Sequence, residues 1–433
     1  MTIIIDLIYL LALVALTPMV IYRIIKQKRY RSGWAQRFGK IARKDQSKKC
    51  IWIHAVSVGE VNAAGTIVKG LENRFADFEI VISTTTDTGF ARANTLYGKK
   101  FTVFYFPLDI SWIMKRAFQQ LKPNICLLME LEVWPNFVKI AQKTGAAVVV
   151  VNGRLSENSF SKYKKIRPIA KKIFEKVSLV LAQTEQYANR FKELGCAEKK
   201  VIVAGSLKYD TAEITDKVKG AYTLAAQLGI DKERLWVTGA TGNDEEKILL
   251  DVFKALKQQE QFGDLRLVIV PRKPERFDEV AALIEQSGFN LIRYSELKTA
   301  TPNAGVKSKI DAVILGDTMG DLRKFYSLAT VIFVGRSLVP MGGSDMAEAT
   351  ALGKCTIFGP YAFNFKHTVD ALLQGQGAVM VKDSQELLET MQKCLSQPDF
   401  AHRIAYNGQE VIRKNQGATA KTIDQIAKFL NIG

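Results

Sequence analysis

IWIHAVSVGEVNAAG, residues 51–65, is the stretch from which the architecture of this chain can be worked out. A short apolar run at 51–53 is followed by small and polar residues up to Gly59. An alanine-rich amphipathic segment then occupies 61–71. This pattern predicts a strand, a tight turn and the start of a helix. In an open α/β sheet such a junction lies at the carboxyl end of a strand, which is where ligands bind.

Glu60 stands at this junction, and two interpretations of it are open. Ser57 and Glu60 have the Ser-x-x-Glu spacing of a capping box, in which both side chains only satisfy backbone donors at a helix start. Alternatively, the Glu60 carboxylate is a general base at the mouth of a cleft.

Working outward, short apolar runs alternate with helical patterns along the whole chain. The expected strands are 51–53, 79–82, 102–106, 125–129, 147–151, 179–182 and 201–203, then 235–239, 265–270, 312–315, 331–334, 355–358 and 378–381. Short apolar strands separated by helices favour doubly wound parallel sheets. The predicted fold class is therefore α/β, with two Rossmann-like domains at 51–210 and 211–399 facing a central cleft, and C-terminal helices at 400–433.

The N-terminus has a different character. Residues 7–22 are apolar apart from Thr17 and Pro18, and eleven basic residues follow between 23 and 49 against a single acid, Asp45. We expect 1–25 to be a membrane-anchoring helix that either spans the bilayer or lies in its interface. The segment 26–50 is expected to be a basic linker, either solvated or attracted to anionic lipid, and its charge predicts a cytoplasmic location for the remainder.

Composition narrows the choice of function. The net charge of +18 over 433 residues indicates an anionic partner: nucleic acid, lipid head groups or a phosphorylated substrate. The five scattered cysteines predict reduced thiols, and the three histidines show no metal-ligand spacing. Neither a P-loop nor a G-x-G-x-x-G fingerprint is present, and no aromatic–basic RNA motif argues for nucleic acid.

Unusual residues follow the predicted strands. Glu60, Glu130 and Lys208 each follow a strand of the first half, whereas Pro271 with Arg272, the 316–320 loop and the 342–348 loop follow strands of the second. An arginine there can bind a phosphate, and a glycine pair before a helix start can admit an anion. Each residue also has a plain structural interpretation: Arg272 and Lys208 as surface charges, Met319 as core, and Asp345-x-x-Glu348 as a second capping box.

Several motifs together resemble those of the Kdo (3-deoxy-D-manno-octulosonic acid) transferases of lipopolysaccharide assembly, over almost the whole chain. They are HAVSVGE (54–60), MELEVWPN (129–136), VNGRLSENS (151–159), GSLKYD (205–210), PRKPERF (271–277), LGDTMGDL (315–322), FVGRSLVPMGG (333–343) and FGPYAFNF (358–365).

This resemblance implies a GT-B fold and a metal-independent, inverting transfer of Kdo from CMP-Kdo to a lipid A precursor (lipid IVA) at the cytoplasmic face of the inner membrane, without a cofactor. It implies Glu60 as proton acceptor and Glu130 with Lys208 as a pair that stabilises the transition state. The residues implied to contact CMP are Pro271, Arg272, Met319, Gly320, Asp321, Asp345, Met346, Ala347 and Glu348.

The sequence departs from the family pattern in five places. Ser344-Asp345 stands for His-Asn, Lys273 for His, Leu131 for Thr, Ser206 for Asn and Arg336 for Gly. These departures concern donor binding more than the reaction. Two alternatives remain: a GT-B transferase for another activated sugar, and a non-catalytic membrane protein that binds nucleotide sugars or anionic lipid.

Overall fold

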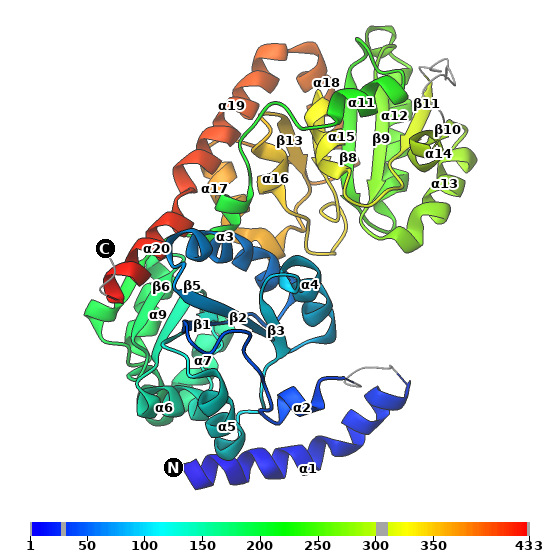
Figure 1. Cartoon of the computed structure of the whole chain (residues 1–433). Coiled ribbons are helices and arrows are strands. Elements are labelled where there is room, and N and C mark those ends of the chain that lie inside the picture. The colour runs from blue at the N-terminus through cyan, green and yellow to red at the C-terminus, as the bar shows by residue number, and fades with distance from the viewer. Residues whose placement is uncertain (1, 27–31, 300–310, 431–433) are drawn as a thin grey trace. The chain divides into compact units, whose positions relative to one another are not determined.

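The computed structural model describes residues 2–26, 32–299 and 311–430 (Figure 1). The chain divides into two compact units. Unit 1 comprises Met1–Thr211 with Gln416–Gly433, and unit 2 comprises Ala212–Asn415. Each unit is built around one parallel sheet, as the alternating pattern predicted.

The sheet of unit 1 has seven parallel strands in the order β3-β2-β1-β4-β5-β6-β7. The strands are β1 (Lys49–His54), β2 (Phe78–Thr84), β3 (Thr102–Tyr105), β4 (Ile125–Met129), β5 (Ala147–Gly153), β6 (Leu179–Ala182) and β7 (Val201–Val203). Its helices are α1 (Thr2–Lys26), α2 (Trp34–Arg37), α3 (Val58–Arg74), α4 (Asp87–Tyr97), α5 (Ser111–Leu121), α6 (Pro135–Thr144), α7 (Glu157–Lys165), α8 (Arg167–Phe174), α9 (Glu185–Glu193), η1 (Glu198–Lys200), α10 (Leu207–Thr211) and α20 (Ala418–Phe429). All seven strands lie where the sequence predicted them, with ends that differ by a few residues.

Apolar side chains cover both faces of this sheet. On one face the fully buried Trp52 ring packs against Phe118 and Phe137, with ring centroids 5.4 and 5.0 Å away. On the other face α3 and α20 pack together, and Ile67 and Ile426 belong to the same core cluster. Unit 1 is therefore completed by the C-terminal end of the chain.

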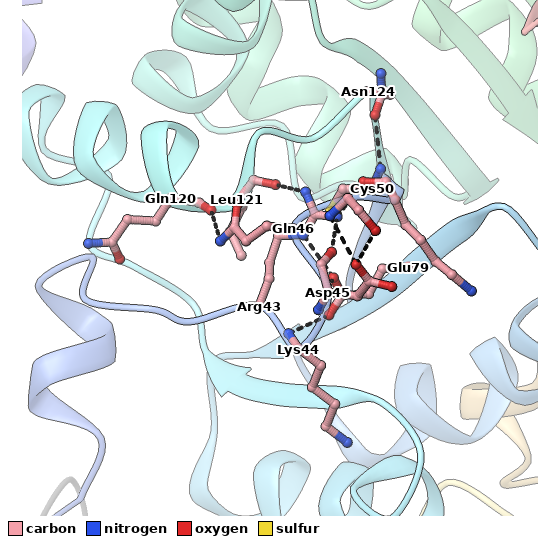
Figure 2. Close-up of polar contacts among 11 residues, drawn as sticks. Arg43, Lys44, Asp45, Gln46, Cys50, Glu79, Gln120, Leu121 and Asn124 are labelled. Atoms are coloured by element: carbon pink, nitrogen blue, oxygen red, sulfur yellow. Dashed lines mark hydrogen bonds and ion pairs between the residues drawn. The ribbon is translucent and has the colours of Figure 1, made fainter.

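The expected basic linker at 26–50 is, in its second half, part of the body of unit 1 (Figure 2). The Arg43 guanidinium donates to Glu79 at 2.8 Å and to the carbonyl oxygens of Leu121 and Lys48 at 2.9 and 2.6 Å. Glu79 also accepts from the Lys44 backbone N–H at 2.8 Å. Because Arg43 is buried and its donors are satisfied, this stretch is folded structure rather than a solvated linker.

Unit 2 has its own seven-stranded parallel sheet, ordered β10-β11-β9-β8-β12-β13-β14. Its strands are β8 (Leu235–Thr241), β9 (Arg266–Pro271), β10 (Asn290–Arg293), β11 (Ala312–Leu315), β12 (Val331–Val334), β13 (Cys355–Phe358) and β14 (Val379–Met380). Its helices are α11 (Ala221–Gln227), α12 (Glu245–Lys257), η2 (Glu260–Phe262), η3 (Pro274–Arg276), α13 (Phe277–Gln286), α14 (Tyr294–Thr299), α15 (Leu322–Leu328), α16 (Met346–Thr350), η4 (Phe363–Phe365), α17 (Lys366–Gln374), α18 (Ser384–Ser396) and α19 (Pro398–Asn415).

Two features of unit 2 differ from expectation. Strand β10 was not predicted, because its sequence NLIR is short, polar at both ends and at most half-buried. The C-terminal stretch expected at 400–433 forms two helices that belong to different units: α19 packs on β13 of unit 2, and α20 packs in unit 1.

Helix α1 carries a row of exposed apolar side chains that includes Leu7, Leu11 and Val14. In the described part of the chain, no helix meets the length and apolarity needed to cross a membrane.

Candidate functional site

The strand order of unit 1 places two of the predicted site residues beside each other. The order reverses between β1 and β4, which pair in parallel register from Ile51–Ile125 to His54–Leu128. Glu60 follows β1 and Glu130 follows β4. Both therefore lie at the carboxyl edge of the sheet at its topological switch point, where open α/β sheets bind ligands.

Glu60 makes the contacts of a capping box. Its carboxylate accepts from the Val56 N–H and from the Ser57 hydroxyl, both at 2.9 Å, and the Glu60 N–H donates to Ser57 Oγ at 3.3 Å. Burial raises the pKa of Glu60; these hydrogen bonds offset part of the rise, and the charge of Glu130 adds to it. A half-buried carboxylate with a raised pKa is a stronger base than an exposed glutamate, so capping and base chemistry are compatible here.

Glu130 has an unusual backbone. Its φ of 57° is left-handed, which costs a residue with a Cβ about 1–2 kcal/mol. The conformation is held because the Glu130 N–H donates to the Val151 carbonyl at 2.9 Å and the Glu130 carbonyl accepts from Arg154 at 3.3 Å. Strain of this kind at a strand end is typical of functional sites.

Glu132 is a third carboxyl of this group, and the sequence analysis missed it. Burial raises the pKa of Glu132 to about 7; a hydrogen bond from the Trp134 indole opposes the rise, and the charges of Glu60 and Glu130 add to it. The Glu-x-Glu spacing within 130–132 was the available signal.

A cavity of about 730 Å³ opens beside these carboxyls within unit 1. Its charged lining includes Glu130, Glu132, Arg154 and Lys162, and its apolar lining comes from Tyr9, Leu131, Val133, Trp134, Pro135, Tyr163, Ile166, Ile169 and Ile173. It can therefore accommodate a molecule with a charged end and an apolar end.

Lys208 lies in α10, which follows β7 at the same edge of the sheet. The start of α10 is tied to the neighbouring loops by Asn152, at the end of β5, whose side-chain oxygen accepts from the Leu207 N–H at 3.1 Å. Asn152 is buried and itself left-handed, with φ 56°. It is a second residue that the sequence analysis did not single out, although it lies within the VNGRLSENS motif.

In unit 2 the strand order reverses between β8 and β12. Pro271 ends β9, is buried and pairs with Thr241, and the Arg272 N–H donates to the Thr241 carbonyl at 3.1 Å. The Arg272 side chain is exposed. This arrangement leaves Arg272 accessible at the carboxyl edge of the second sheet.

Asp345 and Glu348 belong to the loop and short helix that follow β12. The Asp345 carboxylate caps α16 by accepting from the Ala347 N–H at 3.0 Å. Burial raises the pKa of Glu348; the charge of Asp345 adds to the rise, and the charges of Arg323 and Arg272 oppose it. Met346 and Ala347 are buried, and the Ala347 N–H is already bonded to Asp345.

The residues of segment 319–321 differ in how exposed their side chains are. Met319 is 65% exposed and is therefore not a core residue, and Gly320 has φ 90°, which favours glycine. Asp321 is buried and binds Lys298 and Lys324 at 2.6 and 2.7 Å. Burial opposes ionisation of Asp321, but these lysines and Thr318 outweigh it and hold the pKa at about 2. Asp321 thus organises its own loop.

Glu245 is a further organising residue that the sequence did not reveal. It is fully buried, and its carboxylate accepts from the backbone N–H groups of Arg336, Ser337 and Leu338 at 2.6, 2.9 and 3.0 Å. Arg336, where the family usually has glycine, has φ 60°. The left-handed backbone explains that preference, and the Glu245 bond helps to hold the arginine in its place.

Among residues 2–26, 32–299 and 311–430, no group of three or more His, Cys, Asp or Glu side chains is arranged to hold a metal ion. The five cysteines are buried and unbridged.

Two parallel-sheet Rossmann-like units, with acidic residues at one switch point and an accessible arginine near the other, give this chain a GT-B-like fold. Solved structures support this fold. A Staphylococcus aureus MnaA–UDP structure matches with a TM-score of 0.56 at 15% identity, over 89% of this chain and 98% of that one. The Anabaena HepE structure with UDP and glucose matches with a TM-score of 0.52 at 14% identity, over 89% and 99%.

The chain belongs to the Kdo transferase family. Residues 32–211 match the family model described as 3-deoxy-D-manno-octulosonic-acid transferase (kdotransferase). The 3-deoxy-D-manno-octulosonic acid transferase of Haemophilus influenzae is 32% identical over 94% of this chain and 93% of the relative. That of Bordetella pertussis is 28% identical over 98% and 99%. The protein is thus a Kdo transferase of lipopolysaccharide core biosynthesis.

Proposed function

We propose that the protein transfers Kdo from CMP-Kdo to a hydroxyl of the lipid A precursor lipid IVA, with inversion and without a metal ion. Glu60 takes the proton of the acceptor hydroxyl while the oxygen attacks the anomeric carbon. The bond from that carbon to the CMP phosphate breaks, and CMP leaves with the electron pair.

The observation that carries the proposal is the meeting of Glu60 and Glu130 at the switch point of unit 1. Burial raises the pKa of Glu60, and the charge of Glu130 adds to that rise. A base needs a pKa near the working pH, and the neighbouring carboxylate supplies part of that shift. Lys208, at the same edge, would neutralise the Kdo carboxylate or the leaving phosphate.

Unit 2 would bind the donor nucleotide. Arg272 would bind the phosphate, Glu348 would accept from the ribose hydroxyls, and the backbone of 319–321 and 345–347 would contact CMP. The pKa of Glu348 responds to both Arg272 and Asp345, which supports a single compact subsite. The guanidinium would stabilise the leaving group in place of a metal ion.

The cavity of unit 1 suits an amphipathic acceptor. Arg154 and Lys162 are available for the phosphates of a lipid A precursor, and Ile166, Ile169 and Ile173 for an acyl chain. Lipid IVA combines these two features, which also gives the net charge of +18 a role.

We further propose that the enzyme works at the cytoplasmic face of the inner membrane and binds its anionic lipids. The exposed apolar side chains of α1 support interfacial binding. Trp34 and Phe38, which follow α1 in sequence, form an exposed aromatic cluster with Trp112 of α5, with ring centroids 6.1 and 6.3 Å apart. Arg116 lies over the Trp112 ring. Aromatic rings beside cations are typical of membrane interfaces.

The decisive experiment is incubation of the purified protein with CMP-Kdo and tetra-acylated lipid A precursor, followed by mass spectrometry. A product heavier by one or more Kdo residues, with release of CMP, is expected. Product from another activated sugar but not from CMP-Kdo would favour the first alternative. Binding of donor or lipid without any turnover would favour the non-catalytic one.

A further inference from the structure

Helix α1 carries one acidic residue, Asp6, on its docked side rather than on its exposed side. Asp6 and Tyr9 are half-buried, whereas Leu7, Ile8 and Leu10 between and beside them are exposed. Asp6 and Tyr9 therefore form a polar face toward the rest of unit 1, and Leu7, Ile8 and Leu10 lie outside that face.

Asp6 makes three hydrogen bonds to the body of unit 1. Its carboxylate accepts from the Ser111 N–H and from the Asn136 side-chain amide, both at 2.9 Å, and from the Ser111 hydroxyl. Ser111 begins α5, and Asn136 lies in the first turn of α6. A membrane tether needs none of these contacts, because apolar area alone would bind it to lipid.

Tyr9 continues the same network one turn further along α1. Its hydroxyl donates to Asp109 at 3.1 Å, and the buried Asp109 carboxylate accepts from the N–H groups of Asn136 and Phe137 at 3.0 and 2.7 Å. Two of the otherwise unpaired donors at the start of α6 are thus satisfied by Asp109, which Tyr9 holds in place.

The start of α6 forms part of the cavity described above. Trp134 and Pro135, which lead into α6, line it, and the Tyr9 side chain lines it as well. Trp134 also donates to Glu132 at 3.0 Å, which connects the network to the carboxyls of the site.

We infer that α1 is an integral wall of the acceptor cavity, and that Asp6 and Tyr9 are positioning residues for the acceptor. Asp6 fixes the helix against α5 and α6, and Tyr9 sets Asp109 and with it the Trp134–Pro135 wall. The acceptor role of the cavity rests on the proposed function. On this inference, the segment expected to be a membrane-anchoring helix acts on substrate binding even where no bilayer is present.

The chain offers a matched pair of variants for the test. Tyr9→Phe removes only the hydroxyl that binds Asp109, whereas Tyr22→Phe removes a hydroxyl from the same helix at a position 57% exposed. Asp6→Ala is the stronger variant. Each full-length protein is assayed in detergent micelles with tetra-acylated lipid A precursor and CMP-Kdo, and its amide hydrogen exchange is measured at residues 134–138.

For Tyr9→Phe we expect a rise of about fivefold in the KM for the acceptor, the equivalent of one net hydrogen bond. The KM for CMP-Kdo and the sedimentation with anionic vesicles should stay unchanged. Asp6→Ala should raise the acceptor KM by more than tenfold and speed exchange at Asn136 and Phe137. Tyr22→Phe should behave as the wild type.

Two outcomes would overturn the inference. One is faster exchange with unchanged acceptor KM, which would make the network structural only; the other is an equal change in both KM values. A wild-type protein that forms no product would instead contradict the proposed function, and the exchange data would still decide whether Asp6 and Tyr9 fix the start of α6.

Discussion

Replacing Glu60 by glutamine separates the two roles that the sequence left open for this residue. Glutamine keeps the shape and one acceptor oxygen, but it cannot take a proton. If Glu60 is the base, turnover should fall by about 10²–10⁴-fold, which is about 2.7–5.5 kcal/mol of transition-state stabilisation. The cost in folding free energy should be near 1 kcal/mol, since of the two contacts at 2.9 Å glutamine can accept only one without rearrangement.

The chain contains a control with the same local geometry. At the start of α18, Glu386 accepts from the Lys382 N–H at 2.8 Å, and its own N–H donates to Asp383 at 2.9 Å. Glu386→Gln therefore measures what the loss of such a cap costs in stability at a position in unit 2. It should lower the free energy of unfolding by a similar or smaller amount and leave turnover unchanged.

The assay is initial-rate transfer of Kdo to tetra-acylated acceptor across pH, with thermal unfolding and CMP binding measured on the same preparations. Because the pKa of Glu60 is raised, wild-type turnover should fall with decreasing pH at values above the ordinary range of a glutamate. If Glu60→Gln keeps turnover within tenfold of wild type while both variants lose equal stability, Glu60 is only a cap.

Three other substitutions and one reagent give further expectations. The wild type should lose thermal stability as the pH rises from about 4.3 to 7, since a carboxyl whose folded pKa is about 7 destabilises the fold as it ionises. Glu132→Gln should lose less stability over this range, and equal pH profiles of the two proteins would contradict this. Asp345→Asn should change the apparent CMP-Kdo affinity by less than about tenfold, because the carboxylate is engaged with the Ala347 N–H. If donor titration shows a much larger gain in affinity, the native carboxylate opposes the phosphate. Arg336→Gly should raise the free energy of unfolding by about 1 kcal/mol through relief of its left-handed backbone, and denaturant unfolding that shows a loss would refute that account. EDTA should leave turnover unchanged. A loss of turnover with EDTA that magnesium or manganese restores would refute a phosphate held by Arg272 alone.

The sequence was sufficient for every described strand except β10, and for the residues that directly follow those strands. Apolar runs bounded by polar turns are local signals, and the carboxyl edge of a parallel sheet collects whatever comes next. Glu60 and Glu130 were found in this way, although their adjacency depends on the pairing of β1 with β4, which no local pattern reveals.

Residues that act through distant backbone groups could not be found in this way. Glu245 is separated by about ninety positions from the N–H groups that it accepts from. Its acidic neighbours in sequence, Asp244 and Glu246, are equally plausible residues for the start of a helix. Arg43 lies in a run of basic residues that suggests solvent, yet it is buried against Glu79 and backbone carbonyls. In both cases composition describes the neighbours in sequence and not the neighbours in space.

The backbone strain of the molecule points to the same places as the chemistry. Seven non-glycine residues have positive φ in the described chain, and four of them, Glu130, Asn152, Ala240 and Arg336, lie at the carboxyl ends of β4, β5, β8 and β12. Each costs about 1 kcal/mol or more, and the rest of the fold must hold it. The strands concerned include those at the switch points of both sheets, and the other three residues flank helices. Since relaxed loops could join the same elements, strain retained at these edges is better explained by the need to aim side chains and backbone donors than by the connection itself.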